Sequence, residues 1–408
     1  MFSKKFSLII SLAIVAVVNS TATAGKPLKV FILAGQSNMQ GKARVRTIER
    51  LNMTEDGKQM YEDIMGEDSS PAPVKGVYSI YFTGGRSGPS VFKGPLQPGY
   101  EGEITPDSSF GPEYTFGIYM QEHLNEPFLI IKTAWGGKNL LQQFRPPSAG
   151  ELPFDEAKAK KLKAEGALDA AVAEHKKKTG EYYRLMMQHV NEVLADPGTY
   201  HPAYNDEDGY EIAGFVWFQG FNDLVGPYPR VDPTKGKKSP KDFSEYSRLM
   251  ACFIRDVRKD VKAPEMPFVI GAIGIGGPTE DTENQQYWLR KAQEAPAALP
   301  EFKGDVTAVR TEHCWDMELQ RIHDKVNGAV RKKALADNPE LEKKPAAMRN
   351  AVSRLKKTMT PEVLTAEELN FMKAGQSNAE YHYMGSAYTY GKIGKAFADA
   401  LVEMGGEK

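Results

Sequence analysis

Short apolar runs separated by helix-like segments limit the folds that this chain can adopt. The runs have the length of strands, and they lie at Leu28–Ala34, Val77–Phe82, Phe128–Thr133, Ile212–Phe218, Pro267–Ile273 and Asp305–Arg310. Between several of them and after the last, apolar residues recur every three or four positions, as in Tyr390, Ile393, Phe397 and Leu401. Strands that alternate with helices predict an α/β fold with a mostly parallel sheet covered on both faces.

Two charged stretches interrupt this alternation, at about residues 148–180 and 317–375. Neither has a strand pattern, so we expect helical insertions in a single domain that spans residues 25–408. The chain carries 52 Lys and Arg against 53 Asp and Glu, a net charge of −1. No overall field therefore attracts the protein to nucleic acid, and we interpret the basic runs of the insertions as solvent-exposed helix faces.

The first 24 residues are typical of a secretory signal peptide, with a basic start, an apolar run from Phe6 to Val18 and small residues at 22–24. The run is too short for a membrane span, which needs about 20 residues. We therefore expect a secreted or periplasmic protein with no membrane anchor, an uncleaved anchor being the alternative. The two cysteines, Cys252 and Cys314, are too few for a disulfide-rich scaffold. Their pairing and the oligomeric state stay open.

A serine follows the first predicted strand, in Gly35-Gln36-Ser37-Asn38-Met39-Gln40-Gly41. Parallel sheets bind ligands beyond the carboxyl ends of their strands, which is where a nucleophile would be presented. The peptide is not the Gly-x-Ser-x-Gly elbow of the α/β-hydrolases, because Met39 stands where that motif has its second glycine. Ser37 is equally placed to cap the following helix, so both interpretations remain open.

Glycine-rich and polar turns follow two other predicted strands. Gly136 and Gly137 come after the third, where paired glycines let backbone N–H groups approach a ligand. Gln219-Gly220-Phe221-Asn222-Asp223 comes after the fourth, and the side-chain amides of Gln219 and Asn222 can donate to a developing oxyanion. Either turn, taken singly, would also serve as an ordinary connection from strand to helix.

Seven histidines could provide the base that a serine nucleophile requires. His382 differs from the others because it lies on a loop, in Glu380-Tyr381-His382-Tyr383-Met384-Gly385-Ser386, just before the last amphipathic helix. The sequence has no His-Glu-x-x-His motif and no cysteine pair at metal-ligand spacing. We therefore expect no metal, although the segment from Glu312 to Asp316 contains residue types that can bind one.

Taken together and in this order, four blocks resemble those of the SGNH hydrolase superfamily: Gly35-Gln36-Ser37-Asn38-Met39, Trp135-Gly136-Gly137, Gln219-Gly220-Phe221-Asn222-Asp223 and His382. More narrowly they resemble the sialate O-acetylesterase-like carbohydrate esterases, carbohydrate esterase family six and its relatives. The resemblance implies a three-layer, flavodoxin-like fold with helical insertions. It also implies hydrolysis of O-acetyl groups on a carbohydrate substrate without a cofactor.

The resemblance further implies roles for individual residues. Ser37 would be the nucleophile and His382 the base. The oxyanion donors would be the Ser37 backbone N–H, a glycine of the Gly136-Gly137 pair and the side-chain amide of Gln219 or Asn222. Gln36 and Trp135 are our candidates for substrate contacts. Trp135, Phe221 and Tyr383 are expected to stack on sugar faces unless they belong to the core.

One departure concerns the acid of the triad. The family usually has it three residues before the histidine, where this chain has Ala379. Glu380 is the nearest carboxylate and our candidate for the third catalytic residue. The other groups that could orient His382 are Glu312, Asp316, Asn378 and a backbone carbonyl.

The missing acid keeps a second hypothesis open, a non-catalytic glycan-binding protein on the same fold. The chain also contains a second Gly-Gln-Ser-Asn sequence, which ends at Asn378. No strand precedes it and it lacks the following methionine, so we do not expect Ser377 to be a nucleophile.

Overall fold

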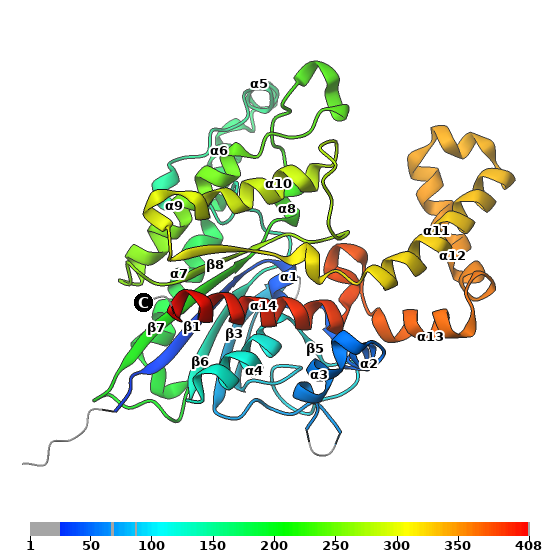
Figure 1. Ribbon diagram of the computed structural model, residues 1–408. Coiled ribbons are helices and arrows are strands. Elements are labelled where there is room, and N and C mark those ends of the chain that lie inside the picture. The colour runs from blue at the N-terminus through cyan, green and yellow to red at the C-terminus, as the bar shows by residue number, and fades with distance from the viewer. Residues whose placement is uncertain (1–24, 67–68, 86–87, 407–408) are drawn as a thin grey trace, which may run out of the picture.

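The computed structural model describes residues 25–66, 69–85 and 88–406, so the predicted signal peptide lies outside the described residues. Within them, the main sheet has seven strands in the order β4-β3-β6-β1-β7-β8-β9 (Figure 1). The strands are β1 (Leu28–Gly35), β3 (Val77–Gly85), β4 (Gly88–Pro95), β6 (Phe128–Ala134), β7 (Tyr210–Phe218), β8 (Phe268–Ala272) and β9 (Val306–Arg310). All neighbours pair in parallel except β3 and β4, which form an antiparallel hairpin at one edge. A separate antiparallel pair joins β2 (Ala43–Arg44) and β5 (Ser109–Phe110).

Helices cover both faces of this sheet and complete three layers. On one face, α4 (Pro112–Leu124) packs Phe116 against Phe31 of β1, and α14 (Ala387–Gly406) packs Phe397 against Phe218 of β7. On the other face, Phe253 of α9 (Ser244–Asp260) lies against the β7 side chains that alternate with Phe218. The predicted α/β architecture, a mostly parallel sheet with helices on both faces, is confirmed.

The remaining helices connect or extend these layers. They are α1 (Ser37–Gln40), α2 (Glu49–Asn52), α3 (Glu55–Ile64), α5 (Glu156–Ala164), α6 (Leu168–Lys178), α7 (Glu181–Ala195), α8 (Phe221–Leu224), α10 (Gln285–Glu294), α11 (Met317–Asp337), α12 (Pro345–Val363) and α13 (Ala366–Gly375). A short 3-10 segment, η9 (Glu380–Gly385), precedes α14. Many of the helices begin or end at a glycine, a proline or a capping side chain, which are residues that commonly mark helix ends.

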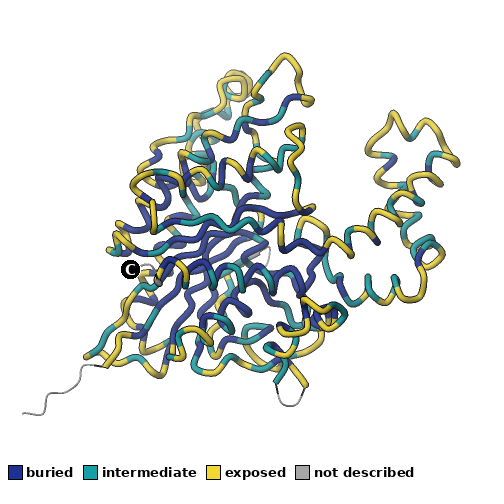
Figure 2. Tube along the Cα trace, viewed as in Figure 1, coloured by how far each residue is buried: buried dark blue, intermediate teal, exposed yellow. Residues whose placement is uncertain are grey.

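The two charged stretches are helical in the structure. Residues 148–180 contain α5 and α6, and residues 317–375 contain α11, α12 and α13. The second group projects from the sheet (Figure 1) and is exposed over most of its surface (Figure 2). It has a small core of its own, formed by Ile322, Val326, Val330 and Leu364.

The strand order of the sheet changes direction next to β1. The strands that follow β1 in the chain, β3, β4 and β6, lie on one side of it, and the later strands β7, β8 and β9 lie on the other side. Gly35, the last residue of β1, is level with Ala134 of β6 and Phe218 of β7. The crevice at such a switch point, beyond the carboxyl ends of the strands, is the usual ligand site of an open α/β sheet.

No helix in the described part of the chain combines the length and the apolar character that crossing a membrane would need. Cys252 and Cys314 are both buried and unpaired. Burial raises the pKa of the Cys314 thiol to about 12, so this thiol stays protonated at neutral pH.

Candidate active site

Three turns converge at the switch point because the strands that lead into them end at the same level. Ser37 is the first residue of α1 and is half-buried. Its hydroxyl lies 3.4 Å from Gln36 Oε1. The Gln36 N–H donates to Phe218 O, and the Trp135 N–H donates to Gly35 O. These bonds extend the sheet ladder into the turns and fix the serine relative to both neighbours.

Gly136 lies beside the serine. A Cβ added at Gly136 would be 3.7 Å from Ser37 Cβ and only 2.9 Å from Gln40 Oε1, so a larger residue would press on the turn that carries the serine. The backbone N–H groups of Ser37, Gly136 and Gly137 donate no hydrogen bond to any other residue that the structure describes. Backbone donors next to a nucleophile, with no partner of their own, can receive an oxyanion.

The structure separates the two amides of the third block. The Gln219 Nε2 is buried and donates to Lys138 O at 3.0 Å and to Asp223 Oδ2 at 2.6 Å. Both amide hydrogens are thus committed, and the expectation that Gln219 could be an oxyanion donor does not fit this geometry. Asn222 is half-buried, and its side chain has no hydrogen bond to a described residue. Of the two, Asn222 is the amide that can face a substrate.

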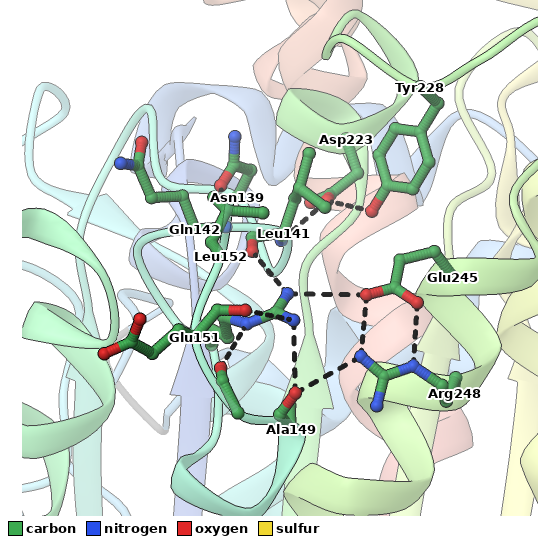
Figure 3. A network of polar contacts seen from close by, with 12 residues as sticks. Asn139, Leu141, Gln142, Ala149, Glu151, Leu152, Asp223, Tyr228, Glu245 and Arg248 are labelled. Atoms are coloured by element: carbon green, nitrogen blue, oxygen red, sulfur yellow. Dashed lines mark hydrogen bonds and ion pairs between the residues drawn. The ribbon is translucent and has the colours of Figure 1, made fainter. Parts of the chain in front are cut away.

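Asp223 ends the third block and is a functional residue that the sequence motifs did not predict. Its buried carboxylate accepts hydrogen bonds from the Leu140 N–H, the Leu141 N–H and the Tyr228 hydroxyl, at 2.8, 3.1 and 2.7 Å. Figure 3 shows the contacts with Leu141 and Tyr228. Burial raises the pKa of Asp223, and these hydrogen bonds oppose the increase. The carboxylate ties the turn after β6 to the turn after β7, and so sets the two groups of oxyanion donors at a fixed distance.

A second network of polar contacts holds the far end of the loop that follows Gly137. The guanidinium of Arg145 donates to the Ala149 and Gly150 carbonyls and lies 3.4 Å from Glu245 of α9. Glu245 is in turn paired with Arg248 (Figure 3). The loop that follows Gly137 is thus anchored at both ends.

His382 has a defined tautomer because of its partner. Its Nδ1 lies 2.9 Å from Asn378 Oδ1, and the Ala379 N–H donates to the same oxygen at 2.8 Å. This backbone donor requires the oxygen, not the amide nitrogen, at that position, so Nδ1 carries a proton and Nε2 has a free lone pair. Burial, and secondarily the Lys42 ammonium, lower the pKa of His382 to about 4. The imidazole is therefore neutral and able to accept a proton at neutral pH.

The histidine turn is fastened directly to the serine turn. The Asn38 amide donates to Tyr381 O at 3.4 Å and accepts a hydrogen bond from the Tyr390 hydroxyl at 3.1 Å. The Ser377 hydroxyl lies within hydrogen-bond distance of the carbonyls of Lys42 and Gly385, at 3.1 and 2.7 Å. Asn38, which directly follows Ser37, and Lys42, five positions after it, thus hold the segment that carries His382.

Backbone strain is concentrated next to the histidine. Tyr383 and Met384 both have left-handed conformations, with φ values of 51° and 57°. Such angles are uncommon for residues other than glycine and persist where tertiary contacts enforce them, often at functional sites. Here the buried Tyr383 hydroxyl accepts a hydrogen bond from the Gly274 N–H at 2.7 Å and lies 2.9 Å from Thr311 Oγ1.

The carboxylates proposed from the sequence do not contact His382. Glu380 is exposed and forms no hydrogen bond or ion pair with a described residue. Asp316 is bound by Arg50 at 2.8 Å and caps α11, and Glu312 is bound by Arg310 at 2.7 Å. Nor do three His, Cys, Asp or Glu side chains gather as a metal site in the described residues.

Three of the side chains that we expected to contact the substrate are buried in the structure. Gln36 is 1% exposed, and its Nε2 finds no hydrogen-bond partner among the described residues. Trp135 is 4% exposed and packs against Phe144 and Tyr182, and Tyr383 is 1% exposed. Neither ring offers a face to a sugar. Only Phe221, of the three aromatics considered, is partly exposed.

Comparison with known proteins places these features in a family. A search of curated proteins returns no match. Among solved structures, a protein of Arabidopsis thaliana is 17% identical, over 70% of this chain and 86% of its own, with a TM-score of 0.37. A carbohydrate acetylesterase from Xanthomonas citri is 14% identical, over 69% of this chain and 49% of its own, with a TM-score of 0.37. This chain therefore matches about half the length of the Xanthomonas protein.

A family model described as "carbohydrate esterase, sialic acid-specific acetylesterase" matches residues 27–331, well over half of the chain. The matched range includes the serine turn, the Gly136-Gly137 turn and the third block, and it ends before His382. The chain belongs to this family of carbohydrate acetylesterases.

Proposed function

We propose that this chain is a secreted carbohydrate O-acetylesterase in which Ser37 is the nucleophile and His382 the general base. The observation that carries the proposal is the hydrogen bond from His382 Nδ1 to Asn378 Oδ1. It leaves Nε2 as a proton acceptor on a turn that is fastened to the serine turn. An amide oxygen can fix the tautomer and orientation of a catalytic histidine, as the Cys-His-Asn arrangement of papain-like proteases illustrates.

The reaction follows from these positions. The Ser37 oxygen attacks the acetyl carbonyl carbon while His382 Nε2 takes the hydroxyl proton. The oxyanion that forms accepts hydrogen bonds from the backbone N–H groups of Ser37 and Gly136 and from the Asn222 amide. His382 then gives the proton to the sugar oxygen as the ester C–O bond breaks. Water, deprotonated by the same nitrogen, hydrolyses the acetyl-serine and releases acetate.

The neutral state of His382 supports this cycle. A half-buried imidazole with a pKa of about 4 is unprotonated at neutral pH, so it can accept the serine proton. Without a carboxylate partner, the imidazolium that forms is less stabilised than in a triad with an acid. Secretion is part of the proposal and rests on the signal-like features of residues 1–24.

The test is covalent labelling with a fluorophosphonate, together with acetate release from an acetylated xylan. The wild-type protein should be labelled at Ser37 and release acetate, and Ser37→Ala should do neither. Ser353→Ala, at an exposed position on α12, is the control and should behave as the wild type. An unlabelled wild-type protein that binds xylan without releasing acetate would favour the glycan-binding hypothesis instead.

A further inference from the structure

The half-buried Phe221 and the exposed Tyr381 form an aromatic pair beside the proposed catalytic residues. Their ring centroids are 5.5 Å apart and their planes are inclined by 24°, so the rings stack. Tyr381 directly precedes His382, and its ring centroid is 4.4 Å from the imidazole. Phe221 directly precedes Asn222. The pair therefore joins the turn that carries the base to the turn that carries an oxyanion donor.

Tyr381 keeps much of its surface open to solvent. It is 46% exposed although it stacks on Phe221. Its hydroxyl forms no hydrogen bond with any other described residue. Three other tyrosines near the site, Tyr228, Tyr383 and Tyr390, are buried and have bonded hydroxyls. Tyr381 thus differs from them in offering both an aromatic surface and a polar group to a ligand.

The chemistry of an ester determines the side of the site on which the alcohol lies. When the acyl-enzyme forms, His382 Nε2 must donate its proton to the alcohol oxygen. The sugar carbon bonded to that oxygen is therefore on the His382 side, whereas the acetyl methyl group lies on the other side of the carbonyl carbon. Of the large hydrophobic residues exposed in the described part of the chain, Tyr381 is the one that adjoins His382 in sequence.

We propose that Phe221 and Tyr381 form a subsite on which the pyranose ring of the acetylated sugar stacks, so that the enzyme recognises a cyclic sugar alcohol and not the acetyl group alone. This inference rests on the proposed function. The C–H groups of a pyranose carry a small positive charge and are attracted to the negative face of an aromatic ring. The Tyr381 hydroxyl adds one donor and acceptor for a sugar hydroxyl. Contact with Phe221 already limits the motion of Tyr381, so little conformational freedom is lost on binding.

The experiment compares two acetyl esters that differ in the alcohol. One is the triacetate of methyl β-xylopyranoside, which presents a pyranose ring, and the other is ethyl acetate, which presents a short acyclic alcohol. Aryl acetates are avoided because their leaving group could itself stack on Tyr381. The variants are Tyr381→Ala, Tyr381→Phe and the control Tyr210→Ala. Tyr210 is also exposed but lies at the start of β7, the opposite end of the strand from the site.

We expect Tyr381→Ala to lower kcat/KM for the pyranoside by about fivefold or more, mainly through KM, and to leave ethyl acetate hydrolysis within about twofold. Tyr381→Phe should retain most of the activity on both esters, and Tyr210→Ala all of it. Equal losses on both esters in Tyr381→Ala, or no loss on the pyranoside, would overturn the subsite. A wild-type protein no more active than Ser37→Ala on either ester would overturn the proposed function, which is a distinct result.

Discussion

Asn378 Oδ1 lies 2.9 Å from His382 Nδ1, the position that a carboxylate holds in a Ser-His-Asp triad. An amide fixes the tautomer as a carboxylate does, but it adds no negative charge to stabilise the imidazolium. The nearby charge is instead positive, from Lys42, and acts with burial to keep the histidine neutral. The surroundings of His382 therefore favour the neutral imidazole, which can accept a proton, and they do not stabilise the imidazolium.

Two substitutions of Asn378 distinguish its role in orienting His382 from the effect of a negative charge at the same position. Asn378→Ala removes the acceptor for Nδ1–H, and we expect kcat to fall by between about tenfold and about 10⁴-fold, as when a catalytic histidine loses its orienting partner. Asn378→Asp keeps an acceptor and adds a negative charge. It should raise the pKa of His382 and move the acidic limb of the kcat/KM profile to higher pH. An unchanged profile in Asn378→Asp would show that this side chain does not face the titrating base.

Glu380→Gln is expected to leave kcat/KM within about twofold of the wild type. Glu380 is exposed and forms no hydrogen bond or ion pair with a described residue, so its charge is screened by solvent. The measurement is acetate release from the same acetylated xylan over a range of pH. A loss of several orders of magnitude would assign Glu380 the role of the acid in solution and would contradict the Asn378 geometry.

The pH dependence of activity should reflect the environment of His382. Its pKa of about 4 predicts that activity rises as the pH increases through about 4, and that most of it is present at pH 6. Lys42→Met removes the second cause of the lowered pKa and leaves burial, the larger cause, in place. The acidic limb should therefore move upwards, but not as far as the ordinary value of 6.5. A downward shift would mean that Lys42 acts on another group.

The sequence was sufficient to predict the fold because the signals are local and repeated. Apolar runs mark six of the seven strands of the main sheet, all except the edge strand β4. Amphipathic patterns mark α9 and α14, and the turns at strand ends follow from the parallel order. It was also sufficient to indicate which turns meet, since parallel strands place their carboxyl ends at one edge.

Partners that depend on exact side-chain direction were not predictable in the same way. Glu380 lies one position beyond Ala379 and forms no hydrogen bond with a described residue. Asn378 reaches His382 across a turn that is closed by the hydrogen bond from the His382 N–H to the Ala379 carbonyl. Gln219 and Asn222 are both amides in one short motif, and only the packing of Gln219 against Asp223 distinguishes them. Burial of Trp135 likewise depends on Phe144 and Tyr182, which come from the following loop and α7.

Asp223 provides the most direct test of how the two donor turns are held together. Asp223→Ala removes the acceptor for the backbone N–H groups of Leu140 and Leu141, so the turn that carries Gly136 is no longer tied to Asn222. Because the oxyanion is absent from the bound ester and develops only as the serine attacks, the loss should appear in kcat more than in KM. A single misplaced oxyanion donor costs about 10²-fold to 10³-fold.

The matched control for this prediction is Asp256→Ala. Asp256 is also a buried carboxylate that accepts a backbone hydrogen bond, from Ser148 at 2.8 Å, but it lies on α9, away from both turns. Both substitutions should lower the thermal unfolding temperature, since each removes backbone hydrogen bonds to a buried carboxylate, which contribute about 1.5–3 kcal/mol each. Only Asp223→Ala should reduce kcat when measured well below the unfolding temperature. Equal kcat losses in the two variants would show that Asp223 acts through stability alone and does not align the donors.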